Sequence, residues 1–157
     1  MEEQYQQILV RYHSDVLEKE SVEMFWGIAI DKAKGLYQVD NIPYYGPEFS
    51  CDDIVFAEQD ETENHLTYRY VAKPSGNSTV QVIVQKDKYN RDDLYNEILL
   101  AGTEIEVVDD YYFVINVLSK TDYRKVYAIL SALEDEELIN FAEPLLSPKH
   151  SADLRTK

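Results

Sequence analysis

Cysteine is nearly absent from this sequence, since Cys51 is the only one among 157 residues. A single cysteine can form neither an intramolecular disulfide nor a cysteine-based zinc site. Asp52 and Asp53 follow it directly, and their carboxylates disfavour the thiolate form that a nucleophilic cysteine requires. We therefore expect neither a disulfide framework nor cysteine chemistry.

Long apolar segments and targeting signals are also lacking. No uninterrupted apolar run approaches the ~20 residues that a membrane-spanning helix needs. Residues 1–15 have neither the basic first segment nor the apolar core of a secretory signal peptide. The sequence predicts a cytoplasmic protein without membrane contact.

Basic residues are scarce relative to acidic ones. The chain has 15 Lys and Arg against 30 Asp and Glu, which gives a formal net charge of −15. Such a surface repels a phosphate backbone, so we expect no binding to nucleic acid. A basic protein is the expected partner, because opposite charge speeds the encounter of two proteins. Charge alone leaves the oligomeric state open.

Recognisable catalytic and metal-binding patterns are missing as well. The three histidines, His13, His65 and His150, lie far apart, and none has a second ligand-type residue at helical spacing. The acidic pairs lack the glycine-centred pattern of a calcium loop. No Ser-His-Asp or paired-carboxylate arrangement follows from the spacing. We expect no metal, no cofactor, no catalytic residue and no enzymatic activity.

The residues that are present predict a mixed α+β protein whose first half is rich in β-strands. Alternation of apolar and polar side chains, or short apolar runs, predict strands at residues 8–12, 24–30, 36–39, 53–58 and 66–72. The polar residues 14–23 are expected to connect the first two. The Pro/Gly/Ser-rich stretch 73–78 predicts a boundary. We expect a small barrel-like domain over residues 1–74.

The second half has a regular order of elements. Residues 79–85 alternate as a strand, and Asn90 to Gly102 has the capping signals of a helix. Two strands follow around Asp109-Asp110, then an amphipathic helix, then a strand at 138–146, although 135–145 alternatively extends that helix. The order βαββαβ predicts a ferredoxin-like domain over residues 75–146. Residues 147–157 are polar and predict a flexible tail.

Residues 38–46, Gln-Val-Asp-Asn-Ile-Pro-Tyr-Tyr-Gly, form the least ordinary corner of the sequence. Pro43 fixes its own φ and biases Ile42 toward extended geometry, while Gly46 is free to adopt a positive φ. Two interpretations stay open for Tyr44 and Tyr45: they present amphipathic rings to a partner, or they pack against the protein. We favour packing.

Acidic residues and tyrosines cluster in a way that is typical of a surface for a basic protein. Seven acids and no basic residue lie between Glu48 and Glu63, and Glu134 to Glu137 form a second acidic block. A soluble surface with tyrosine as sheet filler explains any single cluster equally well. The candidate binding residues are Tyr44, Tyr45, Asp52, Asp53, Glu58, Asp60, Glu61, Glu63, Asp109, Asp110, Tyr111 and Tyr112.

Four short motifs carry a resemblance to a known family. They are the strand with Trp26, the turn Asn41-Ile42-Pro43 followed by Tyr44 and Tyr45, the strand Asp53-Ile54-Val55, and the segment Ser75-Gly76-Asn77-Ser78-Thr79. In this order they resemble an uncharacterised bacterial domain-of-unknown-function family. The resemblance covers about the middle half of the chain. It implies a bacterial cytoplasmic protein and supplies no catalytic residues.

Two functions follow as hypotheses. The first is a non-catalytic, acidic protein-binding module, such as an inhibitor or immunity-type protein for a basic enzyme. The second is a regulatory domain that senses a small molecule in a pocket between the two halves. The segment 75–79 is expected to be a hinge rather than an anion-binding nest. Besides Tyr44 and Tyr45, the pocket residues would be Asn41, Pro43, Ser75, Gly76, Asn77, Ser78 and Thr79.

Overall fold

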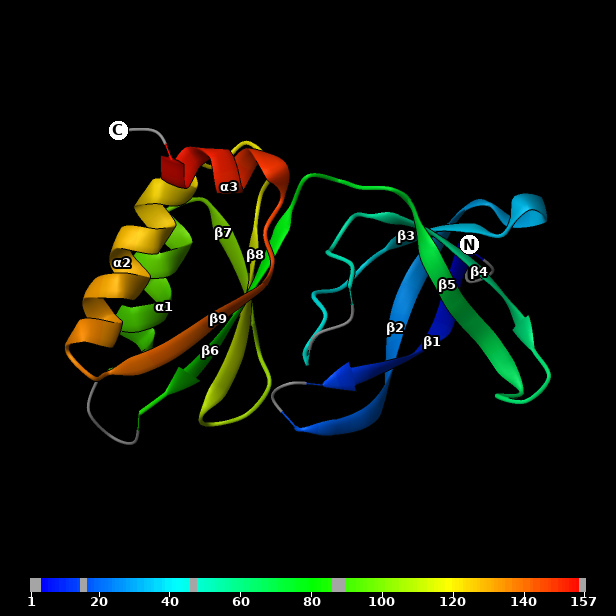
Figure 1. Ribbon diagram of the computed structural model, residues 1–157, viewed down its shortest axis with the longest axis horizontal. Helices are drawn as coiled ribbons and strands as arrows, with labels where there is room; N and C mark the ends of the chain where they lie inside the picture. The colour runs from blue at the N-terminus through cyan, green and yellow to red at the C-terminus, as the bar shows by residue number, and fades with distance from the viewer. Residues whose placement is uncertain (1–3, 15–16, 46–47, 86–89, 156–157) are drawn as a thin grey trace. The chain divides into compact units, whose positions relative to one another are not determined.

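The computed structural model describes residues 4–14, 17–45, 48–85 and 90–155. The chain is a mixed α+β protein that divides into two compact units, Met1–Ser75 and Gly76–Lys157. Each unit has its own sheet (Figure 1). None of the helices in these ranges is long and apolar enough to cross a membrane.

Among its described residues, the N-terminal unit has five strands and the short 3-10 helix η2. The five strands predicted in this half are confirmed, although β2 is longer than expected. The elements are β1 (Tyr5–Ser14), β2 (Lys19–Asp31), η2 (Lys32–Lys34), β3 (Leu36–Val39), β4 (Ile54–Asp60) and β5 (His65–Lys73).

The five strands form a curled sheet in the order β1-β2-β3-β4-β5. Consecutive strands pair antiparallel, and the first and last strands meet in one parallel pairing, Leu9 with Thr67. Because the pairing between β1 and β5 is so short, the sheet is not a regular barrel. Inward-facing residues of alternate strand positions, among them Ile8, Phe25 and Val55, form its core.

Strand β2 begins earlier than the sequence indicated. Residues 19–23, interpreted as part of a polar connection, pair with β1 in unbroken register from Ser14–Lys19 onward. Their sequence is as polar as that of a loop because three of these five residues are exposed and the other two are only half-buried. A tight turn through η2 connects β2 to β3. Its Gly35 has a φ of 72°, and a Cβ there would lie 2.8 Å from the Ala57 carbonyl oxygen.

The described part of the C-terminal unit contains four strands and three helices. Its elements are β6 (Ser78–Val84), α1 (Arg91–Leu100), β7 (Thr103–Val107), β8 (Tyr112–Val117), α2 (Tyr123–Asp135), β9 (Ile139–Leu145) and α3 (Pro148–Arg155).

These strands form an antiparallel sheet in the order β7-β8-β6-β9, and α1 and α2 lie side by side on one face of it (Figure 1). Val82, Leu94 and Leu130 belong to the core between sheet and helices. The predicted cap is confirmed, because the Asn90 side chain accepts a hydrogen bond from the Asp93 N–H. Since α2 ends at Asp135 and β9 follows, the alternative of a longer second helix is wrong.

The last segment is not a flexible tail. Residues 148–155 form α3, and His150 is fully buried. The Asp153 carboxylate accepts hydrogen bonds from the Tyr123 N–H at the start of α2 and from Lys149. Polar contacts hold this helix, so hydropathy did not reveal it. Residues 156 and 157 of the predicted tail lie outside the described ranges.

Candidate functional site

The predicted acidic segment 48–63 is partly neutralised by the protein's own arginines. Arg69 bonds to Glu58 at 2.9 Å and to Asp60 at 2.7 Å, and Arg11 bonds to Glu63 through two contacts of 2.9 and 3.1 Å. These hydrogen bonds hold the pKa of both the Asp60 and the Glu63 carboxyl below their usual values. Only part of the predicted charge therefore faces outward for a partner.

Asp53 has a structural position rather than a surface one. Its side chain is 3% exposed, and its carboxylate accepts hydrogen bonds from the Ser50 N–H, the Ser75 N–H and the Ser75 hydroxyl. The neighbouring Asp52 is exposed, has a φ of 70°, and accepts a hydrogen bond from the Gln38 amide. Of these two predicted binding residues, only Asp52 is accessible. Glu61 is exposed as well.

The predicted binding residues Asp109 to Tyr112 likewise include both exposed and buried side chains. Tyr111 is exposed, whereas Tyr112 is 7% exposed within β8. Asp109 accepts a hydrogen bond from the Tyr111 N–H, and Asp110 lies 3.7 Å from Arg91, whose guanidinium stands 5.6 Å from the Tyr111 ring centroid. This turn therefore presents one tyrosine with a paired carboxylate beside it.

The corner at residues 41–45 is held by one carboxylate of β2. Glu23 accepts hydrogen bonds from the backbone N–H groups of Tyr44 and Tyr45 at 2.8 and 3.2 Å. Pro43 is buried, and both tyrosines are half-buried, with their rings in an edge-to-face pair. The Asn41 side chain accepts a hydrogen bond from the Trp26 N–H. Gly46 lies outside the described residues.

Internal hydrogen bonds engage the segment 75–79. Besides the bonds of Ser75 to Asp53, the Asn77 side chain accepts a hydrogen bond from the Ser119 N–H at 2.8 Å. Gly76 has a φ of 90°. Ser78 and Thr79 are buried residues of β6. The last three residues of the segment are therefore not exposed for ligand binding.

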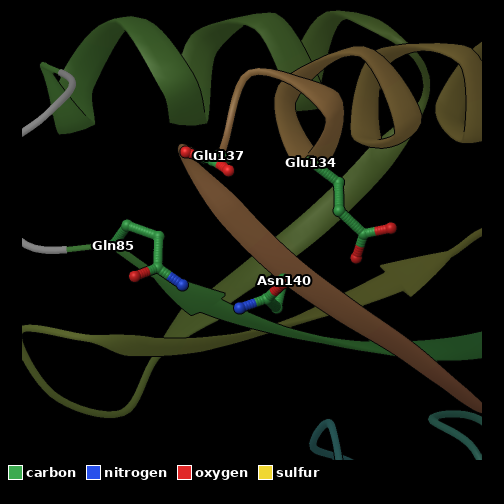
Figure 2. Close-up of a pocket in the computed structure, with 4 residues that line it drawn as sticks. All are labelled: Gln85, Glu134, Glu137 and Asn140. Atoms are coloured by element: carbon green, nitrogen blue, oxygen red, sulfur yellow. The ribbon is translucent and has the colours of Figure 1, made fainter.

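A polar pocket lies where α2 ends and β9 begins, next to the second acidic block. Its volume is about 280 Å³, and Figure 2 shows its lining residues. Two lining residues, Glu134 and Glu137, have carboxylates, and two, Gln85 and Asn140, have amides.

The end of α2 fixes the position of Glu137. The Leu138 N–H bonds to the Leu133 carbonyl at 3.0 Å, and the Glu137 N–H bonds to the Glu134 carbonyl at 2.9 Å. This is the Schellman pattern, in which the residue after the cap adopts a left-handed conformation and is usually glycine. Here that residue is Glu137, with a φ of 61°. A side chain at this position costs stability, so a structural role alone does not favour glutamate.

Strand geometry supplies the other lining residues. Asn140 is the register partner of Ile83, and the Gln85 N–H bonds to the Leu138 carbonyl, which brings the end of β6 beside the start of β9. One oxygen of Glu134, Oε2, accepts a hydrogen bond from the Phe141 N–H at 3.1 Å. This bond fixes the carboxylate at the edge strand and leaves Oε1 for another donor.

Charge at this end of α2 is concentrated and unbalanced. A helix C-terminus carries a partial negative charge, and carboxylates there are unfavourable. Residues 134–137 are all acidic, α2 has no basic residue in its last turn, and no ion pair within the described ranges involves these four. Lys86 and Lys88 lie outside those ranges. The pocket therefore has the chemistry to receive a cationic group.

Metal ligation is a poorer match to the same pocket. No group of three or more His, Cys, Asp or Glu residues in the described part of the chain has the arrangement to hold a metal ion. Two carboxylates and two amides match the donors of a guanidinium or ammonium group instead.

Sequence reasoning noted the acidic block 134–137 but did not select it, and it missed Gln85 and Asn140. A usable signal was present, because four acids follow the last turn of a predicted helix, where basic residues are normally favoured. The amides gave no signal, since only the pairing of β6 with β9 brings them to the carboxylates.

Comparisons with known proteins give the family but no activity. The model of the domain of unknown function DUF4265 matches residues 23–141, which confirms the resemblance to a family of unknown function. None of the curated proteins matches the sequence. A hypothetical protein from Neisseria gonorrhoeae has a similar crystal structure, with a TM-score of 0.77 and 23% sequence identity over 90% of this chain and 95% of that one. This likeness shows the fold alone.

Proposed function

We propose that this chain, which belongs to the family of the domain of unknown function DUF4265, is a non-catalytic module that binds a basic protein partner. The pocket at the end of α2 receives a basic side chain of that partner. An inhibitor or immunity-type role toward a basic enzyme is consistent with this chemistry. Its main support is the pair of pocket carboxylates, Glu134 and Glu137, which form no ion pair with any described residue.

Arginine is the side chain that best matches this pocket. A guanidinium has five N–H donors in a planar fork and pairs with carboxylates through two parallel bonds. The free oxygen of Glu134, the carboxylate of Glu137 and the amide oxygens of Gln85 and Asn140 are all acceptors. The net charge of −15 adds long-range attraction, which speeds association.

A small-molecule sensor is the second candidate. Its support is the volume of the pocket, about 280 Å³, which is near the lower end of the range for small-ligand sites. The lining is polar rather than apolar, so the ligand would be a small basic compound. In this candidate free arginine would bind as tightly as an arginine residue within a peptide, and that comparison separates the two functions.

We also infer a ferredoxin-like fold for the C-terminal unit and an irregular small barrel for the N-terminal unit. The element order βαββαβ and the strand order β7-β8-β6-β9 support the first. The closure of β1 against β5 supports the second. Ferredoxin-like sheets accommodate many functions, so the fold adds nothing to the choice of partner.

The direct test is binding of a fluorescently labelled arginine-rich peptide to the full chain. We expect the double variant Glu134→Gln and Glu137→Gln to bind about tenfold more weakly, because each carboxylate contributes one charge-assisted contact. The glutamine amide oxygen at position 134 still accepts the Phe141 N–H. Raising the salt from about 50 to about 300 mM should weaken binding of the unmodified chain.

A matched control carries the same change in net charge on the other unit. Glu48 and Glu61 are exposed, and the double variant Glu48→Gln and Glu61→Gln should change affinity less than about twofold. Equal weakening by both double variants would mean that the peptide responds to net charge alone, and the pocket would then have no role.

Glu137→Gly is expected to stabilise the protein and weaken peptide binding together. Glycine adopts the left-handed conformation of residue 137 without strain, so the free energy of unfolding should rise by about 1 kcal/mol. Urea unfolding followed by far-UV circular dichroism measures the gain. Glu136→Gly is the control and should lower stability, because Glu136 has a φ of −82°. A destabilised Glu137→Gly variant would contradict the expectation.

A further inference from the structure

A second pocket of different chemistry lies on the N-terminal unit. Its volume is about 320 Å³, and its described lining residues are Tyr5, Trp26 and Asp40. Two aromatic rings and one carboxylate thus border the same space. Trp26 is 49% exposed and Tyr5 is 48% exposed, which is a large exposure for side chains of this size.

Strand register brings these three side chains to one face of the sheet. Tyr5 pairs with Ile28, two residues from Trp26 along β2, so the two rings are diagonal neighbours on the same face. Asp40 follows the last residue of β3, and its N–H bonds to the Trp26 carbonyl at 2.8 Å. Two residues of the site thus lie on the adjacent strands β1 and β2, and the third lies directly after β3.

The corner after β3 holds this arrangement in place. The Asn41 side chain accepts a hydrogen bond from the Trp26 N–H at 2.8 Å, so both backbone polar groups of the tryptophan bond to residues 40 and 41. Ile42 and Pro43 are buried, so the chain is anchored directly after Asp40. The Asn-Ile-Pro motif thus positions the carboxylate beside the indole.

We propose that this pocket binds an organic ammonium group. The face of an aromatic ring attracts a cation through its quadrupole, tryptophan most strongly, and a carboxylate adds a full opposite charge. An anionic ligand would be repelled by Asp40, and a purely apolar ligand would remove water from that carboxylate without replacing it. This site is independent of the pocket at the end of α2, and neither proposal requires the other.

The only tryptophan of the chain is Trp26, so its fluorescence reports on this site alone. Three probes of similar bulk are titrated at constant ionic strength: tetramethylammonium, n-butylammonium and the neutral n-butanol. We expect a saturable change in Trp26 emission with an ammonium probe and none with n-butanol. Tighter binding of tetramethylammonium indicates a quaternary head group as the ligand, and tighter binding of n-butylammonium indicates a lysine side chain.

Two variants test the assignment of the site. Asp40→Asn and Tyr5→Leu should each weaken binding of the ammonium probe about fivefold, while Glu61→Gln leaves it unchanged. Urea unfolding confirms that the variants are folded. The proposal is overturned if neither ammonium probe gives a saturable signal, if n-butanol binds equally well, or if Asp40→Asn binds as tightly as the unmodified chain.

Discussion

Replacing Asp53 by alanine should lower the free energy of unfolding of the N-terminal unit by about 3 kcal/mol. The carboxylate accepts hydrogen bonds from two backbone N–H groups and one hydroxyl, at 2.8 to 2.9 Å, in surroundings where it is 3% exposed. Alanine removes this acceptor from the N–H groups of Ser50 and Ser75, while the Ser75 hydroxyl keeps the Cys51 carbonyl oxygen at 2.9 Å. Each unsatisfied donor costs about 1–3 kcal/mol, partly relieved if water enters.

Urea unfolding followed by Trp26 emission measures this loss, because the only tryptophan lies in the same unit. Asp53→Asn keeps one acceptor oxygen and should lose about half as much. Asp52→Asn is the matched control and should change stability by less than about 0.5 kcal/mol, since Asp52 is exposed and asparagine tolerates its left-handed backbone. A loss as large in Asp52→Asn would refute the structural role assigned to Asp53.

The position of Asp53 shows that a cluster of acidic residues in the sequence does not reveal which of them are buried. Asp53, Val55 and Ala57 are buried at alternate positions, so the period of strand β4 already directs the aspartate inward. Composition nevertheless predicts surface charge at this position, because aspartate is rarely buried without partners. Its partner, Ser75, is 22 residues away, and no local pattern indicates that pairing.

Elements with local signals were predictable. Helix α1 has a capping asparagine, and α2 has Val126 and Leu130 at helical spacing. Both helices could therefore be predicted from the sequence alone. The start of β2 and the site residues Gln85 and Asn140 were not predictable, because they depend on pairing with distant strands. Register is a tertiary property that composition and periodicity do not contain.

Helix α3 is the largest departure from the sequence prediction, and a buried histidine explains it. His150 Nε2 lies 3.0 Å from the Leu118 carbonyl, which accepts only, so this nitrogen carries the proton. The other nitrogen, Nδ1, then accepts from the Ser78 hydroxyl at 2.5 Å. The same hydroxyl oxygen accepts from the Ser147 N–H. One neutral imidazole thus connects α3 to β6 and to the end of β8.

His150→Ala is therefore expected to lower the free energy of unfolding by about 3 kcal/mol at about pH 7. The substitution leaves a cavity in place of a ring that is fully buried, and it removes the acceptor of the Ser78 hydroxyl proton, while the Leu118 carbonyl keeps the Thr121 N–H. Urea unfolding followed by far-UV circular dichroism measures the loss. Lys149→Ala is the control on the same helix and should cost less than about 1 kcal/mol, because Lys149 is exposed. If residues 147–155 were a frayed tail, His150→Ala would cost no more than this control.

Because His150 is buried as a neutral imidazole, we expect acid to destabilise the protein. Burial lowers the pKa of His150 below its ordinary value of 6.5, and the nearby Lys149 acts in the same direction. Between the folded-state pKa and 6.5 the unfolded chain binds a proton that the folded chain does not. Stability is therefore complete above about pH 6.5, falls as the pH decreases below it, and stops falling below the folded-state pKa. Unfolding of His150→Gln over about pH 7 to 5 should lack this histidine-dependent slope, because glutamine does not titrate there. Equal slopes in the two proteins would mean that the pKa of His150 is the same in the folded and the unfolded chain, and the assignment of a buried neutral imidazole would be wrong.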